Sequence, residues 1–203
     1  MSITQHDEDL PHGLDFGSSV AVDTEAMGLN PYRDRLCLVQ LSAGDGTCHL
    51  VHFHNRDYHA PNLTRLLADP TVEKVFHFAR FDLAILRHYL GVSCQPVYCT
   101  KIASKLARTY TDRHGLKDLC QDLLGIELSK QMQSSDWGVP ALSEAQLTYA
   151  AHDVLHLHRL RERLDAMLTR ERRQELARAC FAFLPRRAEL DLAGWAGVDI
   201  FAY

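Results

Sequence analysis

Apolar residues in the first quarter of the chain recur with the two-residue period of β-strands. The period is found at residues 19–24, 36–42 and 47–53, where β-branched and other apolar residues alternate with polar ones. Turn-like stretches at 28–31 and 43–46 separate these segments, and the shorter gap favours an antiparallel hairpin. The pattern predicts that the chain opens with a three-stranded antiparallel meander.

Helical periodicity dominates the rest of the chain, with one further strand predicted at 73–77. Phe81, Ile85 and Tyr89 recur every fourth residue in a segment that stops at Gly91, which is typical of a helix with a glycine cap. Helices are predicted at residues 63–68, 80–90, 101–107, 116–124, 143–168 and 170–183.

The longest of these helices begins at Ser143, which has the capping-box spacing with Gln146, and is expected to continue to about residue 168. The last helix is followed by an apolar, aromatic tail after Pro185. Strands come first and helices follow, with one strand between helices. This order predicts an α/β fold, a sandwich built on a mixed sheet with flanking helices.

Composition and charge are those of an ordinary folded protein. The chain has 203 residues, 46% hydrophobic and 24% charged, so we expect one domain. A net charge of -4 excludes a protein that coats nucleic acid with a uniformly basic surface. Neither a membrane span nor a secretory signal is recognisable, so a cytoplasmic protein without membrane attachment is expected. The six irregularly spaced cysteines are expected to be buried thiols.

Acidic residues provide the candidate chemistry. Asp23 and Glu25 lie two apart at the end of a predicted strand, where the period of two points both carboxylates to one face. By itself this pair is more typical of a solvated strand end. Asp82 and Asp153 are different, because apolar residues flank them and an unpaired buried carboxylate is costly. Tyr149 precedes Asp153 by four residues and therefore shares its helix face.

Four carboxylates brought together would repel one another unless cations bound them. Sites made only of oxygen ligands select hard divalent ions such as Mg²⁺ or Mn²⁺. The residue types therefore predict a divalent metal site.

The acidic segments also resemble a known family. Asp23-Thr24-Glu25, residues 77–82 (HFARFD), and Tyr149 with Asp153 are similar to the three motifs of the DEDD 3′-5′ exonucleases, in the subclass with tyrosine in the third motif. Residues 131–137 (QMQSSDW) and 146–154 (QLTYAAHDV) are most similar to the RNase D branch. The resemblance implies an RNase H-like exonuclease fold.

The resemblance covers about residues 18–168 and leaves a helical extension and tail over 169–203. Full RNase D proteins carry further helical RNA-binding domains, so the chain is more similar to the compact nano-RNase C type. That type implies a single exonuclease domain over 1–203. It also implies a homo-oligomer, for which an octameric ring is the candidate assembly.

The family implies two-metal hydrolysis of phosphodiester bonds, with release of nucleoside 5′-monophosphates from the 3′ end. By resemblance, Asp23 would bridge two Mg²⁺ or Mn²⁺ ions, and Glu25 and Asp153 would hold the ion on the nucleophile side. Asp82 would act on the other side, and Tyr149 would orient the attacking water. A tyrosine is a poor base at neutral pH, so we credit deprotonation of that water mainly to the metal.

Substrate contacts are predicted less sharply. Leu29 matches a position from which related exonucleases wedge a leucine between the last two bases, and the alternative is an ordinary core or turn leucine. His77 is either a sugar or phosphate ligand or a buried strand-end histidine. Trp137 either stacks on a base or packs the loop. The other candidate substrate contacts are Thr24, Gln131 and Ser135.

Three other features have more ordinary explanations. Cys48, His49, His52, His54 and His59 match no common zinc spacing. The nine arginines and five acids of residues 159–189 are typical of a solvated helix face, with guidance of phosphates or a subunit contact as alternatives. Trp195, Phe201 and Tyr203 make the tail apolar beyond what a free end requires, so we expect them to cover the core or form an interface.

The sequence therefore predicts a metal-dependent 3′-5′ exoribonuclease that acts on very short single-stranded RNA, down to dinucleotides, with DNA as a second substrate. Trimming of structured RNA 3′ ends, as in RNase D, is the enzymatic alternative. A non-catalytic nucleic-acid-binding module on the same fold is the alternative from another class.

Overall fold

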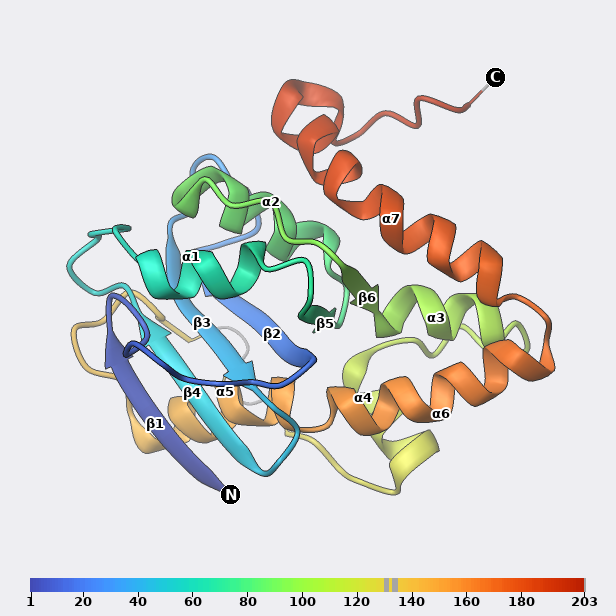
Figure 1. Cartoon of the computed structure of the whole chain (residues 1–203), viewed down its shortest axis with the longest axis horizontal. Coiled ribbons are helices and arrows are strands. Elements are labelled where there is room, and N and C mark those ends of the chain that lie inside the picture. The colour runs from blue at the N-terminus through green and yellow to red at the C-terminus, as the bar shows by residue number, and fades with distance from the viewer. Residues whose placement is uncertain (130–131, 133–134, 203) are drawn as a thin grey trace.

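The computed structural model of the chain describes residues 1–129, 132 and 135–202 (Figure 1). Its strands form one sheet in the order β1-β4-β3-β2-β5-β6. The β2-β3-β4 part is antiparallel, and β1, β5 and β6 add to its sides as parallel strands. The strands are β1 (Ser2–Asp7), β2 (Ser19–Ala26), β3 (Leu36–Ser42), β4 (Thr47–His52), β5 (Glu73–Phe76) and β6 (Val97–Cys99). The predicted meander, the fourth strand and the mixed α/β architecture are confirmed.

Helices cover both faces of the sheet. In Figure 1, α1 and α2 lie in front of the strands and α5 lies behind them, whereas α3, α6 and α7 gather beyond β6. The helices are α1 (Pro61–Ala68), α2 (Arg80–Leu90), α3 (Thr100–Ala107), α4 (Leu116–Leu119), α5 (Glu144–Leu155), α6 (Leu157–Arg170) and α7 (Gln174–Leu190). Short π-helical turns over Cys120–Leu124 and Asp191–Trp195 extend α4 and α7. No helix among the described residues combines the length and apolar composition of a membrane-spanning helix.

The predicted helix over 143–168 is wrong in one respect, because it is two helices. At His156 the backbone has φ -106 and ψ -5, and this break separates α5 from α6. The predicted start is confirmed, because the Ser143 hydroxyl accepts from the Gln146 backbone N–H at 3.3 Å, and the Gln146 side chain accepts from the Ser143 N–H at 3.0 Å. The break redirects the chain from the sheet face toward α3.

The last helix is longer than predicted. α7 continues through Pro185 to Leu190, although proline cannot donate the hydrogen bond to the carbonyl four residues earlier. The Pro185 ring is buried, so it packs within the protein at this point of the helix. The tail after Pro185 that the sequence predicted is therefore mostly helix.

Two strands were not predicted. β1 is a polar edge strand whose side chains are mostly exposed, so its sequence has no apolar alternation. β6 is three residues long, too short for a periodic signal. Both form by parallel pairing with strands remote in sequence, which local patterns do not report.

The sheet positions the acidic motifs. β2 lies between β3 and β5 and is parallel to β5, so the carboxyl ends of β2 and β5 meet at the same edge. Glu25 stands near the end of β2, and β5 leads directly into α2, which carries Asp82. The first and second acidic motifs are thereby brought side by side.

Candidate active site

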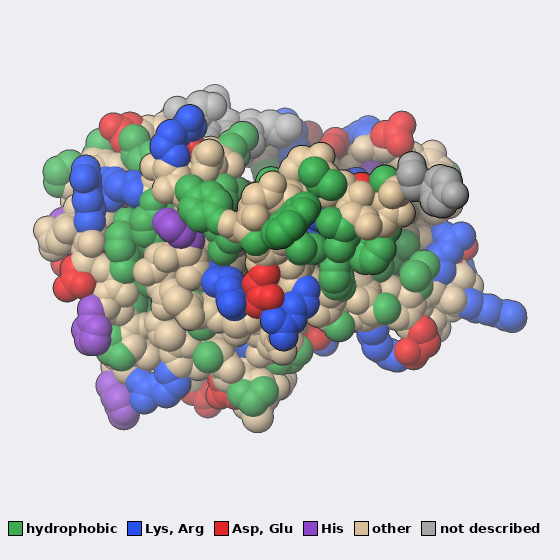
Figure 2. Space-filling model, turned by 90° about the horizontal axis from the view of Figure 1, so that it is seen from above, with side chains coloured by type: hydrophobic (Ala, Val, Ile, Leu, Met, Phe, Trp, Pro, Cys, Tyr) green, Lys and Arg blue, Asp and Glu red, His purple; other side chains and the backbone are tan. Residues whose placement is uncertain are grey.

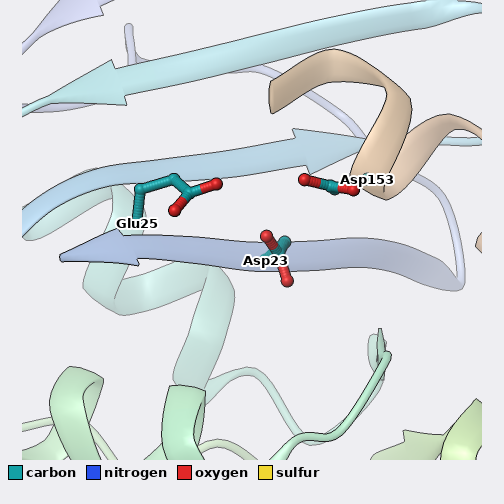
Figure 3. Close-up of side chains that lie close together, drawn as sticks. All are labelled: Asp23, Glu25 and Asp153. Carbon is teal, nitrogen blue, oxygen red and sulfur yellow. The ribbon is translucent and has the colours of Figure 1, made fainter. Parts of the chain in front are cut away.

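Three carboxylates converge on one face of the sheet. Asp23, Glu25 and Asp153 each place one oxygen within 4.8 Å of the others. Figure 3 shows Asp23 and Glu25 rising from β2 and Asp153 reaching toward them from α5. Within the described residues, this is the group of histidine, cysteine and acidic side chains with the geometry to hold a metal ion.

Local sequence explains how each acid reaches this point. The alternation of β2 puts Asp23 and Glu25 on the face that α5 covers. α5 packs on the sheet through Ala150, Ala151 and Val154, which are buried. The small alanines allow the helix axis to approach the strands closely, and Asp153 is carried on the same helix.

Asp82 lies beside this cluster, close enough for its charge to act on Asp23, Glu25 and Asp153. It lies in the first turn of α2 and is 4% exposed. Its Oδ1 accepts a 2.6 Å hydrogen bond from the Thr24 hydroxyl, which is also buried. Asp82 and Asp23 both line a cleft of about 660 Å³. Thr24, predicted as a substrate contact, therefore holds a catalytic candidate in place.

Burial dominates the electrostatics of the four acids. It raises the pKa of Asp23 well above its usual range, and the charges of Asp82, Asp153 and Glu25 raise it further. Burial and the charges of Asp153 and Asp82 raise the pKa of Glu25 to about 9. Burial also raises the pKa values of Asp82 and Asp153 to about 7 each. In metal-free protein the cluster therefore retains protons at neutral pH.

This donor set fits divalent cations. Among the described residues, no lysine or arginine forms a salt bridge with Asp23, Glu25, Asp82 or Asp153. All four ligands offer carboxylate oxygens, which Mg²⁺ and Mn²⁺ prefer. These carboxylates repel one another, and a bound cation would relieve that repulsion, which favours cation binding.

Tyr149 belongs to the same constellation. It lies one helical turn before Asp153, and its hydrogen bond to that carboxyl partly offsets the effect of burial on the pKa of Asp153. The pKa of Tyr149 is itself raised, first by burial and then by the charges of Asp153, Glu25 and Asp23. Its hydroxyl therefore keeps its proton at neutral pH and can donate a hydrogen bond.

His77 follows β5 and faces the cleft. Its Nδ1 is 2.9 Å from the Thr100 hydroxyl, which itself donates to the Phe76 carbonyl. Because Thr100 occupies Nδ1, Nε2 is the ring nitrogen of His77 left for a substrate. Burial, then the charge of Lys101, lowers the pKa of His77 to about 3. The imidazole is therefore neutral.

The remaining predicted contacts have different environments. Leu29 is 89% exposed and lines the cleft, so the core interpretation is wrong and the wedge position stays open to substrate. Trp137 is 2% exposed and packs near Tyr149, with ring centroids 6.1 Å apart. The prediction that Trp137 stacks on a base is therefore wrong, because its faces are covered by protein.

The two remaining candidates precede α5 in the sequence. The Ser135 hydroxyl accepts from Gln146 at 3.3 Å. Gln131 lies outside the described residues.

Sequence reasoning missed several residues at the site. Gln40, fully buried in β3, donates to Asp23 at 3.4 Å. A glutamine inside an otherwise apolar strand was a usable signal for this role. Phe78 lies in the cleft with φ 67, which is unusual for a residue other than glycine, and Lys101 lies 3.9 Å over its ring. No pattern in the sequence marked Phe78.

Residues 5–169 match a protein-family model described as 3′-5′ exonuclease. Ribonuclease D of Granulibacter bethesdensis is 39% identical over 159 residues, which are 76% of this chain but 38% of that protein. The chain thus spans less than half the length of the curated relatives it matches most strongly.

Solved structures match the whole chain. NrnC of Brucella melitensis with bound Mg²⁺ is 55% identical, with a TM-score of 0.96 and full coverage of both chains. The same protein bound to pGG is 56% identical, with a TM-score of 0.97, and the match covers 100% of this chain and 99% of that one. These matches include the residues after 169, which the family model does not reach.

Proposed function

This chain belongs to the 3′-5′ exonuclease family, and from that premise we propose that it is a metal-dependent exoribonuclease for short RNA. It would degrade oligoribonucleotides, down to dinucleotides, to nucleoside 5′-monophosphates. The convergence of Asp23, Glu25 and Asp153 within 4.8 Å, with Asp82 beside them, is the observation that carries the proposal. Full-length similarity to NrnC bound to Mg²⁺ and to pGG supports it.

Asp23, Glu25 and Asp153 would hold one divalent ion, and Asp23 and Asp82 would hold a second. Bound there, Mg²⁺ or Mn²⁺ supplies Lewis-acid stabilisation of the scissile phosphate and a more acidic attacking water. Gln40 fixes Asp23 by its 3.4 Å hydrogen bond, and Thr24 fixes Asp82 by its 2.6 Å hydrogen bond. These partners preserve the geometry that the acids need.

The other residues of the site would act on the substrate. The protonated hydroxyl of Tyr149, beside Asp153, orients the attacking water. Nε2 of the neutral His77 forms a hydrogen bond with a sugar hydroxyl, because its Nδ1 is engaged with Thr100. The exposed side chain of Leu29 separates two neighbouring bases.

The size of the cleft supports a short substrate. Two cavities share Asp23: one of about 660 Å³, which Asp82 and Leu29 also line, and one of about 330 Å³, which Glu25, Tyr149 and Asp153 line. Each falls within the range of roughly 300 to 1,000 Å³ that is typical of small-molecule sites. A site of this size holds few nucleotides, so short single-stranded RNA is the proposed substrate and DNA a second one. We treat residues 1–203 as a single exonuclease domain.

Two further proposals concern the setting of the enzyme. All six cysteines are free, and five are buried, which supports a reducing compartment such as the cytoplasm.

Exposed apolar side chains near the C-terminus support a homo-oligomer, with an octameric ring as the candidate assembly. Trp195 is 46% exposed and Phe201 is 77% exposed.

End-labelled RNAs of two to about twenty nucleotides, and a folded tRNA precursor, test the proposal in Mg²⁺ or Mn²⁺. We expect loss of single nucleotides from the 3′ end, with the highest kcat/KM on the shortest RNAs. Excess chelator, Asp23→Asn and Asp153→Asn should each abolish the reaction. Preference for the folded precursor would favour RNase D-like trimming, and RNA binding without hydrolysis would favour a non-catalytic module.

A further inference from the structure

One wall of the cleft comes from a segment beyond the family match, which covers residues 5–169. Asp191 and Ala196 line the cleft together with Asp82. We call residues 191–196 the C-terminal wall. The exonuclease motifs do not require this segment, so its presence at the site calls for a separate explanation.

Two arginines hold the C-terminal wall in place through the Asp191 carboxylate, and one of them binds it in a bidentate manner. Arg80 donates to the Asp191 carboxylate from Nε at 2.5 Å and from Nη2 at 2.7 Å, and also to the Ala196 carbonyl at 2.6 Å. Arg187 adds a contact of 3.0 Å to the same carboxylate. The Asp191 side chain is 9% exposed and the Arg80 side chain 36%, so the carboxylate is shielded from water, and the bidentate geometry makes this pair more specific than a single-contact surface salt bridge.

Arg80 links the C-terminal wall to the acidic site. It is the first residue of α2, and it precedes Asp82 on that helix by two residues. The wall itself is a π-helical turn at the end of α7, and Gly194 reverses the chain there with φ 99. In Figure 1, the red C-terminal segment turns back at the end of α7, above α2. Figure 2 looks onto the molecule from above and shows acidic, basic and apolar side chains intermingled on that face.

Asp82 tells which end of the substrate meets the wall. In the proposed mechanism Asp82 acts on the leaving-group side, and for a 3′-5′ exonuclease the leaving group is the upstream part of the RNA. The wall lines the same cleft as Asp82. Upstream nucleotides that occupy this cleft would therefore meet Asp191 and Ala196.

We propose that the C-terminal wall, held by the Arg80–Asp191–Arg187 cluster, limits how many nucleotides fit upstream of the scissile bond and is the determinant of short-substrate preference. This inference rests on the proposed exoribonuclease function. Asp191, Arg80 and Arg187 are positioning residues, because they act through the placement of the wall.

A second ion pair between the same two helices provides a matched control. Arg87 on α2 contacts Glu189 on α7 at 3.1 Å, and Glu189 also pairs with Arg186. Neither Arg87 nor Glu189 lines the cleft. If the role of Asp191 were only to brace α2 against α7, then Glu189→Gln would have the same effect as Asp191→Asn.

The test measures kcat and KM of the full chain on a dinucleotide and a heptanucleotide with Mg²⁺. For Asp191→Asn we expect the ratio of kcat/KM, dinucleotide over heptanucleotide, to fall about tenfold, mainly through a higher KM for the dinucleotide. Glu189→Gln should keep the native ratio. Gly194→Ala changes no charge, yet it strains the turn because φ 99 disfavours a side chain, so it should lower the ratio as well.

Thermal unfolding of each variant accompanies the kinetics. A folded Asp191→Asn protein with the native ratio would overturn the inference, as would an equal fall of the ratio in Glu189→Gln. If Asp191→Asn fails to fold, the kcat/KM ratio of Gly194→Ala decides whether the inference holds. If neither variant folds, the segment is part of the folding core, and the inference is overturned as well. Absence of Mg²⁺-dependent hydrolysis in the native protein would instead refute the proposed function.

Discussion

At the scale of single residues, the acidic cluster combines catalytic geometry with a cost in stability. Asp23 lies among three other carboxyls, and burial together with their charges raises its pKa. A neutral side chain of the same shape at this position would relieve repulsion while it removes a metal ligand. Activity and metal-free stability should therefore respond to the same substitution in opposite directions.

We predict that Asp23→Asn lowers kcat by at least about a thousandfold, because a metal ligand central to the site is lost. In chelator at pH 8, the same variant should unfold at a higher temperature than the native protein, because asparagine is neutral without the proton that Asp23 must take up on folding. Single-turnover hydrolysis and calorimetry measure the two effects. A lower unfolding temperature under these conditions would contradict the electrostatic account of the site.

Tyr149→Phe tests the role of the hydroxyl. Loss of an oriented hydrogen bond to the attacking water should lower kcat about a hundredfold and leave KM nearly unchanged. Tyr98→Phe is the control, because Tyr98 donates to Asp165 at 2.9 Å outside the acidic cluster. A rise in KM without loss of kcat would assign Tyr149 to substrate binding.

At the scale of elements, the helix that carries the third motif depends on its cap. Ser143 and Gln146 satisfy each other's backbone N–H groups at the start of α5, and Gln146 also donates to the Asp136 carbonyl at 2.9 Å. The cap therefore fixes both the helix and the loop before it. Tyr149 and Asp153 are displayed from a helix whose first turn is held in this way.

Ser143→Ala should destabilise the protein by about 1 kcal/mol, the usual effect of a lost N-cap. Because the cap touches neither substrate nor the acids, kcat at 25 °C should stay near the native value. Urea unfolding and steady-state kinetics check the two statements. A large loss of kcat with native stability would place Ser143 in the catalytic site.

At the scale of the whole molecule, the four acids link stability to pH and metal. Glu25 has a pKa of about 9, and Asp82 and Asp153 have pKa values of about 7, all above those of exposed carboxyls. The folded state therefore binds more protons than the unfolded state, and this contribution to stability is lost as pH rises through these values.

Metal-free protein should consequently unfold at lower temperature as pH rises from 7 to 9, a window in which His77, with its lowered pKa, is neutral in the folded state and mostly neutral in the unfolded state. Saturating Mg²⁺ should raise the unfolding temperature more at pH 9 than at pH 7. Thermal scans in chelator and in Mg²⁺ measure both trends. A metal-free unfolding temperature that does not fall over this window would show that the acids titrate normally.

Assembly is also a property of the whole molecule. The exposed apolar groups of the tail include Val198, Ile200 and Phe201, and burying them against a second copy would remove them from water. Light scattering at micromolar concentration should give a mass above that of one chain, and Phe201→Asp should lower it. A native monomer would refute the homo-oligomer.

The sequence by itself determined the character of most elements and the chemistry of the site. Strand and helix periods are local, so the central strands, most helices and the cap at Ser143 followed from them. The mixed sheet and the RNase H-like exonuclease fold predicted from pattern and motifs are confirmed. Asp23 with Glu25, and Tyr149 with Asp153, were paired by spacing alone, because each pair lies on one element.

Only the tertiary structure decided what depends on contacts between distant segments. It brought Asp153 to β2, buried Trp137, and divided the predicted long helix at His156. It paired β1 and β6 with remote strands and carried Asp191 from the chain's end to the cleft. Burial and pairing of this kind are set by the packing of the whole chain, which a local pattern of hydrophobic and polar residues does not encode.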